Sequence, residues 1–209
     1  MIVDPNMHPR IPSQLGEPAW EVTQFFPPQG QWRESDFLRI HTNKMAELVN
    51  GRLEILPMPT WRHQCIVKQI SLALQAYITE RQLGGEVLFA PLPSPLFPGT
   101  IREPDILYVR PENIPSDIVD YPDQLDLVME IVSEGSEARK RDYVDKRLDY
   151  ARAGITEYWI VDPEFTRITV LSLEGNDYRV HCECNAGDTA HSAMFADFTI
   201  AVDDVFKLS

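Results

Sequence analysis

The sequence is poor in cysteine and in basic residues and has no long apolar run, and each shortage excludes a class of protein. Three cysteines among 209 residues, Cys65, Cys182 and Cys184, cannot all pair, and they supply neither a disulfide framework nor the two cysteine pairs of a zinc site. No stretch approaches the roughly 20 apolar residues of a membrane-spanning helix, and the N-terminus lacks the basic start and apolar run of a secretory signal. We therefore expect a cytoplasmic protein with reduced thiols and no membrane association.

Basic residues are outnumbered, because 19 Lys and Arg face 32 Asp and Glu and leave a net charge of −13. This charge disfavours indiscriminate binding to a phosphate backbone. The charges are also segregated: nine acidic residues and one basic residue lie between Glu103 and Glu134, whereas Arg139 to Arg152 contains six basic residues in fourteen positions. An acidic patch beside a basic one suits a metal-dependent phosphodiesterase, although two separate solvated faces explain it too.

Residues 1–34 are rich in proline and glutamine, so we expect an N-terminal arm followed by a single domain over residues 35–209. The clearest elements are a hairpin with an Asn50-Gly51 turn and an amphipathic helix over residues 62–83. We expect further helices over 35–41, capped by Ser35, and over 137–153, a loop with four prolines after residue 89, and strands over 86–89, 105–109, 125–132, 157–161, 168–173 and 178–183. This order predicts an α/β fold of the α+β kind, with a central mixed sheet flanked by helices and extra hairpins at both ends.

Glu130 is the most informative residue because it interrupts an apolar strand. Alternation places it on one face with Val128 and Val132, and a carboxylate there is costly to bury unless it is paired, protonated or bound to a metal. Asp105 directly precedes another apolar strand and poses the same problem. Two such acids facing one way would form an oxygen-rich site suited to Mg²⁺ or Mn²⁺. The alternative is a buried ion pair of Glu130 with Arg102 or Lys146, with Asp105 capping a loop.

Several motifs occur together in a fixed order along the chain. They are Glu47-Leu48-Val49-Asn50-Gly51 with His63 downstream, Pro104-Asp105, Val128-Met129-Glu130-Ile131-Val132-Ser133, Asp142-x-x-x-Lys146, and the run from Tyr150-Ala151 to Asp162-Pro163. Over roughly residues 35–205, this set resembles the Uma-type family of restriction endonucleases in the PD-(D/E)XK nuclease superfamily. Pro-Asp alone carries no information, whereas the ordered set is specific.

The resemblance implies a restriction-endonuclease-like core in which Asp105 and Glu130 bind Mg²⁺ or Mn²⁺. The superfamily usually places a lysine two residues after the second acid, but Val132 occupies that position here. The resemblance offers Lys146, from the next helix, as the replacement; otherwise Lys146 forms an ordinary i,i+4 ion pair with Asp142.

Glu47 and His63 match further positions of the family, and each has two interpretations. Glu47 is a third acid of the site or a cross-strand partner in the hairpin. His63 orients a phosphate or a water, or it caps a backbone carbonyl at the end of the helix.

The expected activity is metal-assisted hydrolysis of DNA phosphodiester bonds, with Asp105, Glu130, Lys146, Glu47 and His63 in the site. Further basic residues are expected to contact flanking phosphates; these are Arg139, Lys140 and Arg141. DNA is the expected partner by resemblance, and a homodimer is expected because related nucleases often cut two strands. The alternatives are a catalytically silent nuclease-like domain that binds a partner protein, and a structural or regulatory module whose buried acids only form ion pairs.

Overall fold

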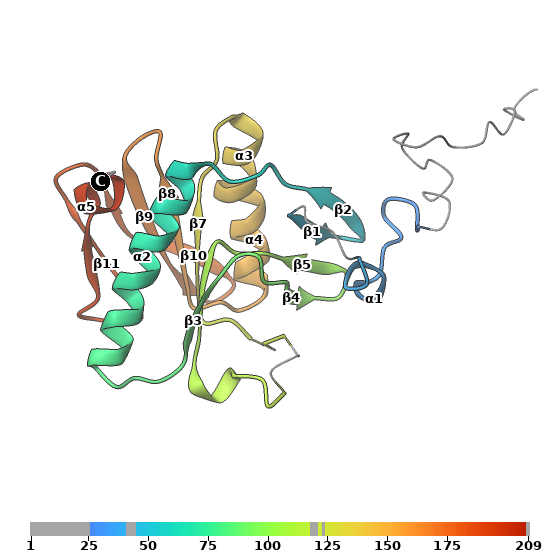
Figure 1. Cartoon of the computed structure of the whole chain (residues 1–209), viewed down its shortest axis with the longest axis horizontal. Helices are drawn as coiled ribbons and strands as arrows, with labels where there is room; N and C mark the ends of the chain where they lie inside the picture. The colour runs from blue at the N-terminus through green and yellow to red at the C-terminus, as the bar shows by residue number, and fades with distance from the viewer. Residues whose placement is uncertain (1–25, 41–44, 118–120, 123, 208–209) are drawn as a thin grey trace, which may run out of the picture.

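The computed structural model describes residues 26–40, 45–117, 121–122 and 124–207 (Figure 1). The strands are β1 (Ala46–Val49), β2 (Arg52–Ile55), β3 (Glu86–Phe89), β4 (Ser94–Phe97), β5 (Thr100–Arg102), β6 (Ile106–Val109), β7 (Leu127–Ile131), β8 (Glu157–Asp162), β9 (Arg167–Glu174), β10 (Asp177–Cys184), β11 (Thr189–His191) and β12 (Thr199–Ala201). The helices are α1 (Glu34–Phe37), α2 (Trp61–Glu80), α3 (Ser136–Lys140), α4 (Lys146–Arg152) and α5 (Val202–Phe206), with a 3₁₀ turn at Pro111–Asn113 and a π-helical turn at Arg141–Asp145.

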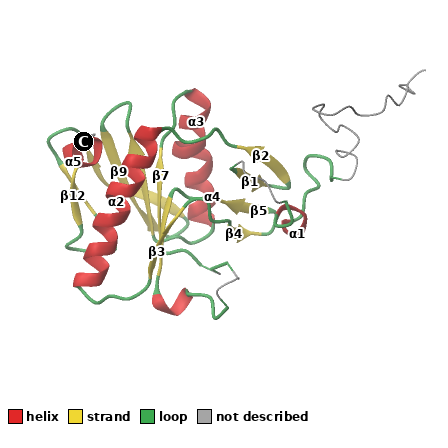
Figure 2. Cartoon of the chain, viewed as in Figure 1, coloured by secondary structure: helices red, strands yellow, loops and turns green. Residues whose placement is uncertain are grey.

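The central sheet has the strand order β10-β9-β8-β7-β6-β3, and its only parallel neighbours among the described strands are β7 and β8. Helices cover both faces of this sheet (Figure 2), so every residue of β7 and β8 is buried. On one face α2 and α5 pack against Leu127, Met129 and Ile131. On the other, α4 packs against Val128 and Val132. The predicted strand phase and the predicted fold class, a mixed sheet flanked by helices, are both confirmed.

The long helix α2 begins at Trp61 because Thr60 caps it, accepting a hydrogen bond from the His63 backbone N–H at 3.2 Å. Its inner face carries Ile66, Ile70 and Leu74, all fully buried. Each such side chain contributes about 1.5–3 kcal/mol of stability. Packing on the central sheet therefore holds the N-terminal end of α2, and with it His63, in a fixed place.

The smaller sheet has the order β2-β1-β5-β4. Its β1–β2 hairpin turns at Asn50 (φ +50°) and Gly51 (φ +73°), the positive φ values that the Asn-Gly pair predicted. The Gly51 carbonyl accepts hydrogen bonds from the N–H groups of Gly30 and Trp32, at 2.8 and 3.0 Å. The chain before α1 therefore lies on the hairpin as far as it is described. Residues 1–25 lie outside the described residues, so the boundary between arm and domain remains a prediction.

Two expectations about local structure were wrong. The proline-rich segment is not a plain loop, because it contains the β4–β5 hairpin. Prolines did not prevent this, since β4 is an edge strand whose outer side needs no N–H donors. Ser35 is not a helix cap: α1 follows Arg33, whose backbone N–H donates to Asp36 Oδ2 at 3.2 Å.

The helix expected over residues 137–153 is present but divided by its π-helical turn into α3 and α4. This turn contains Asp142 and ends just before Lys146. The last part of the chain adds β11, β12 and α5, whose apolar residues, with Phe195, Phe198 and Phe206, pack against the α2 side of the sheet. Within the described residues, none of the helices is long and apolar enough to cross a membrane.

Candidate active site

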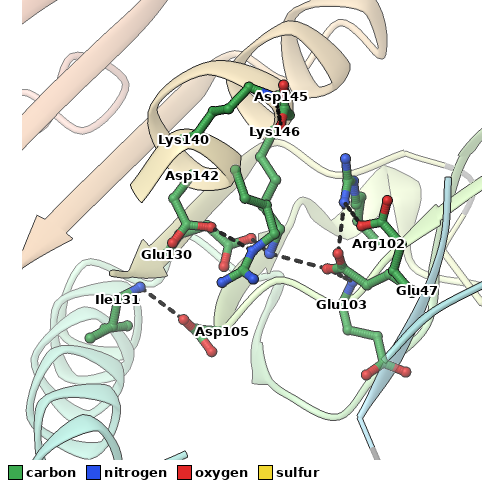
Figure 3. A network of polar contacts seen from close by, with 12 residues as sticks. Glu47, Arg102, Glu103, Asp105, Glu130, Ile131, Lys140, Asp142, Asp145 and Lys146 are labelled. Carbon is green, nitrogen blue, oxygen red and sulfur yellow. Dashed lines mark hydrogen bonds and ion pairs between the residues drawn. The ribbon is translucent and has the colours of Figure 1, made fainter. Parts of the chain in front are cut away.

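Asp105 and Glu130 lie on neighbouring elements of the central sheet and border the same small cavity, of about 30 Å³. Asp105 directly precedes β6, and Glu130 lies in the paired strand β7 (Figure 3). The Asp105 Oδ2 atom accepts a hydrogen bond from the Ile131 N–H at 2.8 Å and lies 3.1 Å from His63 Nε2. The two predicted metal ligands are thus brought together, and the backbone of one strand fixes the carboxylate that belongs to the other.

Each of the two acids, Asp105 and Glu130, has one carboxylate oxygen with no hydrogen-bond partner among the described residues. The Glu130 Oε1 atom accepts from Lys146 Nζ at 2.7 Å and also from the Tyr150 hydroxyl. Within the described part of the chain, neither Asp105 Oδ1 nor Glu130 Oε2 makes a hydrogen bond with another residue. Each acid therefore keeps one oxygen free for a ligand at the cavity.

Lys146, the first residue of α4, is 2% exposed, and its ammonium group contacts two acids, Glu130 and Glu47. Its Nζ lies 2.7 Å from Glu130 Oε1 and 3.1 Å from Glu47 Oε1. Burial alone would lower the pKa of Lys146, but the carboxylates of Glu130 and Glu47 outweigh burial and raise it above its usual value. Because an ammonium has three donors, two such contacts leave one N–H for another acceptor. The alternative, an i,i+4 pair with Asp142, is not what forms, since Asp142 contacts Arg141 instead, at 3.1 Å.

Glu47 belongs to the same network and does not pair across its hairpin. Its register partner on β2 is another acid, Glu54. The buried Glu47 carboxylate accepts from Arg102 Nη1 at 2.7 Å and from the Glu103 N–H at 3.1 Å. Burial alone would raise the pKa of Glu47, but Lys146 and Arg102 outweigh burial and lower it to about 2. Glu47 therefore stays ionised and holds Lys146 from the side opposite Glu130 (Figure 3).

Negative charge is crowded around the cavity. Burial raises the pKa of Glu130 to about 8, although the Lys146 ammonium opposes this, and the nearby carboxylates of Asp105 and Asp142 add to the rise. Burial and the Glu47 carboxylate also raise the pKa of Glu103 to about 7. Repulsion between acids that share one site is the condition that a bound cation relieves.

His63, the third residue of α2, joins the cavity to a larger cleft, because its side chain lines both. Its Nε2 contacts Asp105, and its buried Nδ1 has no hydrogen-bond partner among the described residues. The alternative of a helix-end histidine bound to a backbone carbonyl is therefore not what the structure shows. Nδ1 is therefore the ring nitrogen that remains available to a water or a ligand.

Each of the three basic residues that were predicted to contact phosphates already contacts a carboxylate. Arg139 binds Asp162 and, at 2.7 Å, Glu164. Arg141 contacts Asp142, and Lys140 lies 3.4 Å from Asp145. Arg139 borders the cleft and Arg141 the cavity, whereas Lys140 is not among the residues that line either.

The cleft has a volume of about 800 Å³ and lies between the start of α2 and the turn that joins β8 to β9. It shares Pro57, His63, Ile131 and Ser133 with the small cavity, so the two spaces are adjacent. An Arg62 Nη2 hydrogen bond to the Pro163 carbonyl, at 3.0 Å, links the two walls. The acids therefore lie beside a cleft large enough for a small molecule or part of a polymer.

Sequence reasoning missed Glu103 and Tyr150, and it gave Arg102 the wrong partner, Glu130. Arg102, which is 1% exposed, binds Glu47 and, at 2.6 Å, Asp149. Glu103 lines the cavity with a buried Oε2 that has no partner among the described residues. Tyr150 donates to Glu130. Arg102 and Glu103 directly precede Pro104-Asp105, and that adjacency was the available indication.

Two comparisons with known proteins agree with this fold. The model of the Uma2 family, described as "Putative restriction endonuclease", matches residues 23–203. The crystal structure of a "putative nuclease belonging to DUF820" from Anabaena variabilis ATCC 29413 has a TM-score of 0.68 and 18% identity, and the match covers 86% of this chain and 98% of that one. At that identity the likeness concerns the fold alone. No curated protein matches the chain. Because the family model covers most of its length, the chain belongs to the Uma2 family.

Proposed function

We propose that this protein is a metal-dependent nuclease that hydrolyses phosphodiester bonds in DNA at the cavity between Asp105 and Glu130. The observation that carries the proposal is the pair of carboxylates, Asp105 just before β6 and Glu130 on β7, each with one oxygen that has no partner among the described residues, beside the Lys146 ammonium. Membership of a family described as restriction endonucleases and the likeness to a nuclease fold support the same reaction.

The residues present fit a Mg²⁺ or Mn²⁺ ion. A space of about 30 Å³ holds a single ion or water, since a water needs roughly 10–15 Å³ measured in this way. Within the described residues, no group of three or more His, Cys, Asp or Glu side chains is arranged to hold a metal. Asp105 and Glu130 would therefore be the protein ligands, which agrees with the habit of Mg²⁺ to bind one or two carboxylates and to keep several waters.

The chain's own residues would orient the substrate and stabilise charge. A bound Mg²⁺ or Mn²⁺ supplies a Lewis acid that polarises the phosphate and lowers the pKa of a bound water. Lys146 stays protonated, so it acts as a donor to negative charge that develops on the phosphate, not as a base. Glu47 positions Lys146, and His63 contacts a water or a polar group of the substrate through its ring Nδ1.

Cleavage of labelled single-stranded and duplex DNA tests the proposal. We expect cleavage in Mg²⁺ or Mn²⁺ that stops in chelator and falls at least about a hundredfold in Asp105→Asn. The exposed Asp197→Asn serves as the matched control, with unchanged activity expected. Equal cleavage by Asp105→Asn would refute the site. A protein that binds the metal and cleaves no DNA would favour the silent, partner-binding alternative.

A further inference from the structure

The cleft beside the acid pair has exposed apolar side chains at its edges. Met58 lines the cleft and is 68% exposed. Trp61 is 83% exposed and stands between two residues of the cleft wall, Thr60 and Arg62. An indole this exposed at the first residue of a packed helix serves no core, so it is available to a ligand.

A second exposed aromatic residue adjoins the other wall. Phe165 is 55% exposed and stands between Glu164 and Thr166, which both line the cleft. The guanidinium of Arg139 lies over its ring, 4.5 Å from the centroid. The hydrogen bond from Arg62 to Pro163 keeps this turn close to the start of α2. Trp61 and Phe165 therefore adjoin residues that line the cleft on two different elements, although neither is itself part of the lining.

Most of the positive charge near the cleft is already paired with carboxylates; the exception among the described residues is Arg62, which donates to the Pro163 carbonyl. Arg139 is held by Asp162 and Glu164, and Arg141 by Asp142. The whole chain carries a net charge of −13. Duplex DNA is held mainly by cations that neutralise its phosphates, whereas unpaired strands are also held by bases that stack on aromatic side chains. The composition of this cleft suits the second mode.

We propose that the substrate is single-stranded DNA, with unpaired bases stacked on Phe165 and Trp61 and the backbone directed through the cleft towards Asp105 and Glu130. The cleft volume, about 800 Å³, accommodates one or two nucleotides. The cleft adjoins the cavity, because His63, Ile131 and Ser133 line both. This inference rests on the proposed function, because it names the substrate of the same site.

Binding of a fluorescein-labelled 12-nucleotide strand, and of the same sequence as a duplex, tests this inference by fluorescence anisotropy. The full chain is used, with Ca²⁺ in place of Mg²⁺ so that a cation is present. We expect the single strand to bind at least tenfold more tightly than the duplex. Phe165→Ala and Trp61→Ala should each weaken binding of the strand by about five- to a hundredfold, the range for one stacked base. Leu72→Ala, which removes a 62% exposed side chain from the outer face of α2, should leave binding unchanged.

Equal or tighter binding of the duplex would overturn the inference, and so would variants at Phe165 and Trp61 that both bind within twofold of wild type. Phe165→Leu separates stacking from structure, because it keeps an apolar side chain and should still weaken binding. Thermal melts confirm that each variant is folded. Equal cleavage of duplex and single strand would support the proposed function and contradict this inference. Binding of the strand through Phe165 without any cleavage would contradict the proposed function alone.

Discussion

Neutralising Glu130 is expected to stabilise the metal-free protein at neutral and alkaline pH. Glu130 is 3% exposed, and the carboxylates of Asp105 and Asp142 add to the rise of its pKa, to about 8 against an ordinary value of 4.5. Between these two pH values the unfolded chain ionises Glu130 while the folded protein keeps it protonated. The free energy of unfolding therefore falls as pH rises from about 4.5 to about 8, and below that window the penalty is absent.

The size of this loss of stability follows from the difference between the pKa of Glu130 in the folded protein and its ordinary value. Each unit corresponds to about 1.36 kcal/mol, so the loss in wild type reaches the order of a few kcal/mol by pH 8. Glu130→Gln keeps the shape of the protonated acid and cannot ionise, so this loss should disappear. The Lys146 ammonium is not left alone, because Glu47 lies 3.1 Å from it. In chelator at pH 7 or above, the variant should match wild type or exceed it.

Denaturant unfolding at pH 5, 7 and 9, with and without Mn²⁺, measures this prediction. A metal that binds only the folded state adds about 2.7 kcal/mol at one hundred times its dissociation constant. Wild type should gain this increment and Glu130→Gln should not. Glu54→Gln, at a residue whose side chain is 44% exposed, is the matched control and should behave as wild type.

A buried salt bridge without a metal role predicts the opposite result. If Glu130 serves only to neutralise Lys146, its loss leaves a buried cation, which costs about 3–5 kcal/mol. A variant that unfolds several kcal/mol below wild type in chelator, with an unchanged dependence on pH, would refute the reasoning.

Three further predictions follow from the same contacts. Lys146→Met should reduce cleavage by about 10²–10³-fold and leave Mn²⁺ binding in place, since Lys146 contributes charge and is not a metal ligand. If nuclease assays and calorimetry show that the variant has lost both cleavage and Mn²⁺ binding, this role is wrong. Glu47, whose pKa is lowered to about 2, contributes stability above pH 4.5 that is lost as pH falls towards 2. Glu47→Gln should therefore lower the free energy of unfolding by about 3–5 kcal/mol at pH 7. In denaturant titrations the variant should also lack the acid-induced loss of stability that wild type shows. We also predict a homodimer, for which the 60% exposed Phe89 on the edge strand β3 offers a surface, and light scattering that reports a monomer at high concentration would exclude it.

The acid pair could be predicted from the sequence because it depends on strand phase. Alternation in residues 127–132 placed Glu130 opposite the face of Leu127, and the two core clusters confirm this. The Asn50-Gly51 turn was also predictable, since few residue pairs tolerate two positive φ values. Local rules were sufficient wherever the decisive interaction lies within one strand or one turn.

The partners of Lys146 could not be predicted by local rules. An α-helical reading pairs it with Asp142, but the π-helical turn and the approach of β1 give it Glu47 and Glu130 instead. Arg102 was given the wrong partner for a similar reason, because prolines concealed an edge hairpin that pairs through β5 with β1, far away in sequence. These contacts depend on how two sheets and a helix meet, which no single segment encodes.

Calorimetric titration of the metal-free protein with Mn²⁺ tests most directly whether Asp105 and Glu130 form a metal site. We expect wild type to bind Mn²⁺ with release of protons near pH 7, because Glu130 must ionise to act as a ligand. Asp105→Asn should lose this binding, while Asp197→Asn should retain it. Wild type that binds no Mn²⁺, or Asp105→Asn that binds it as wild type does, would contradict the account.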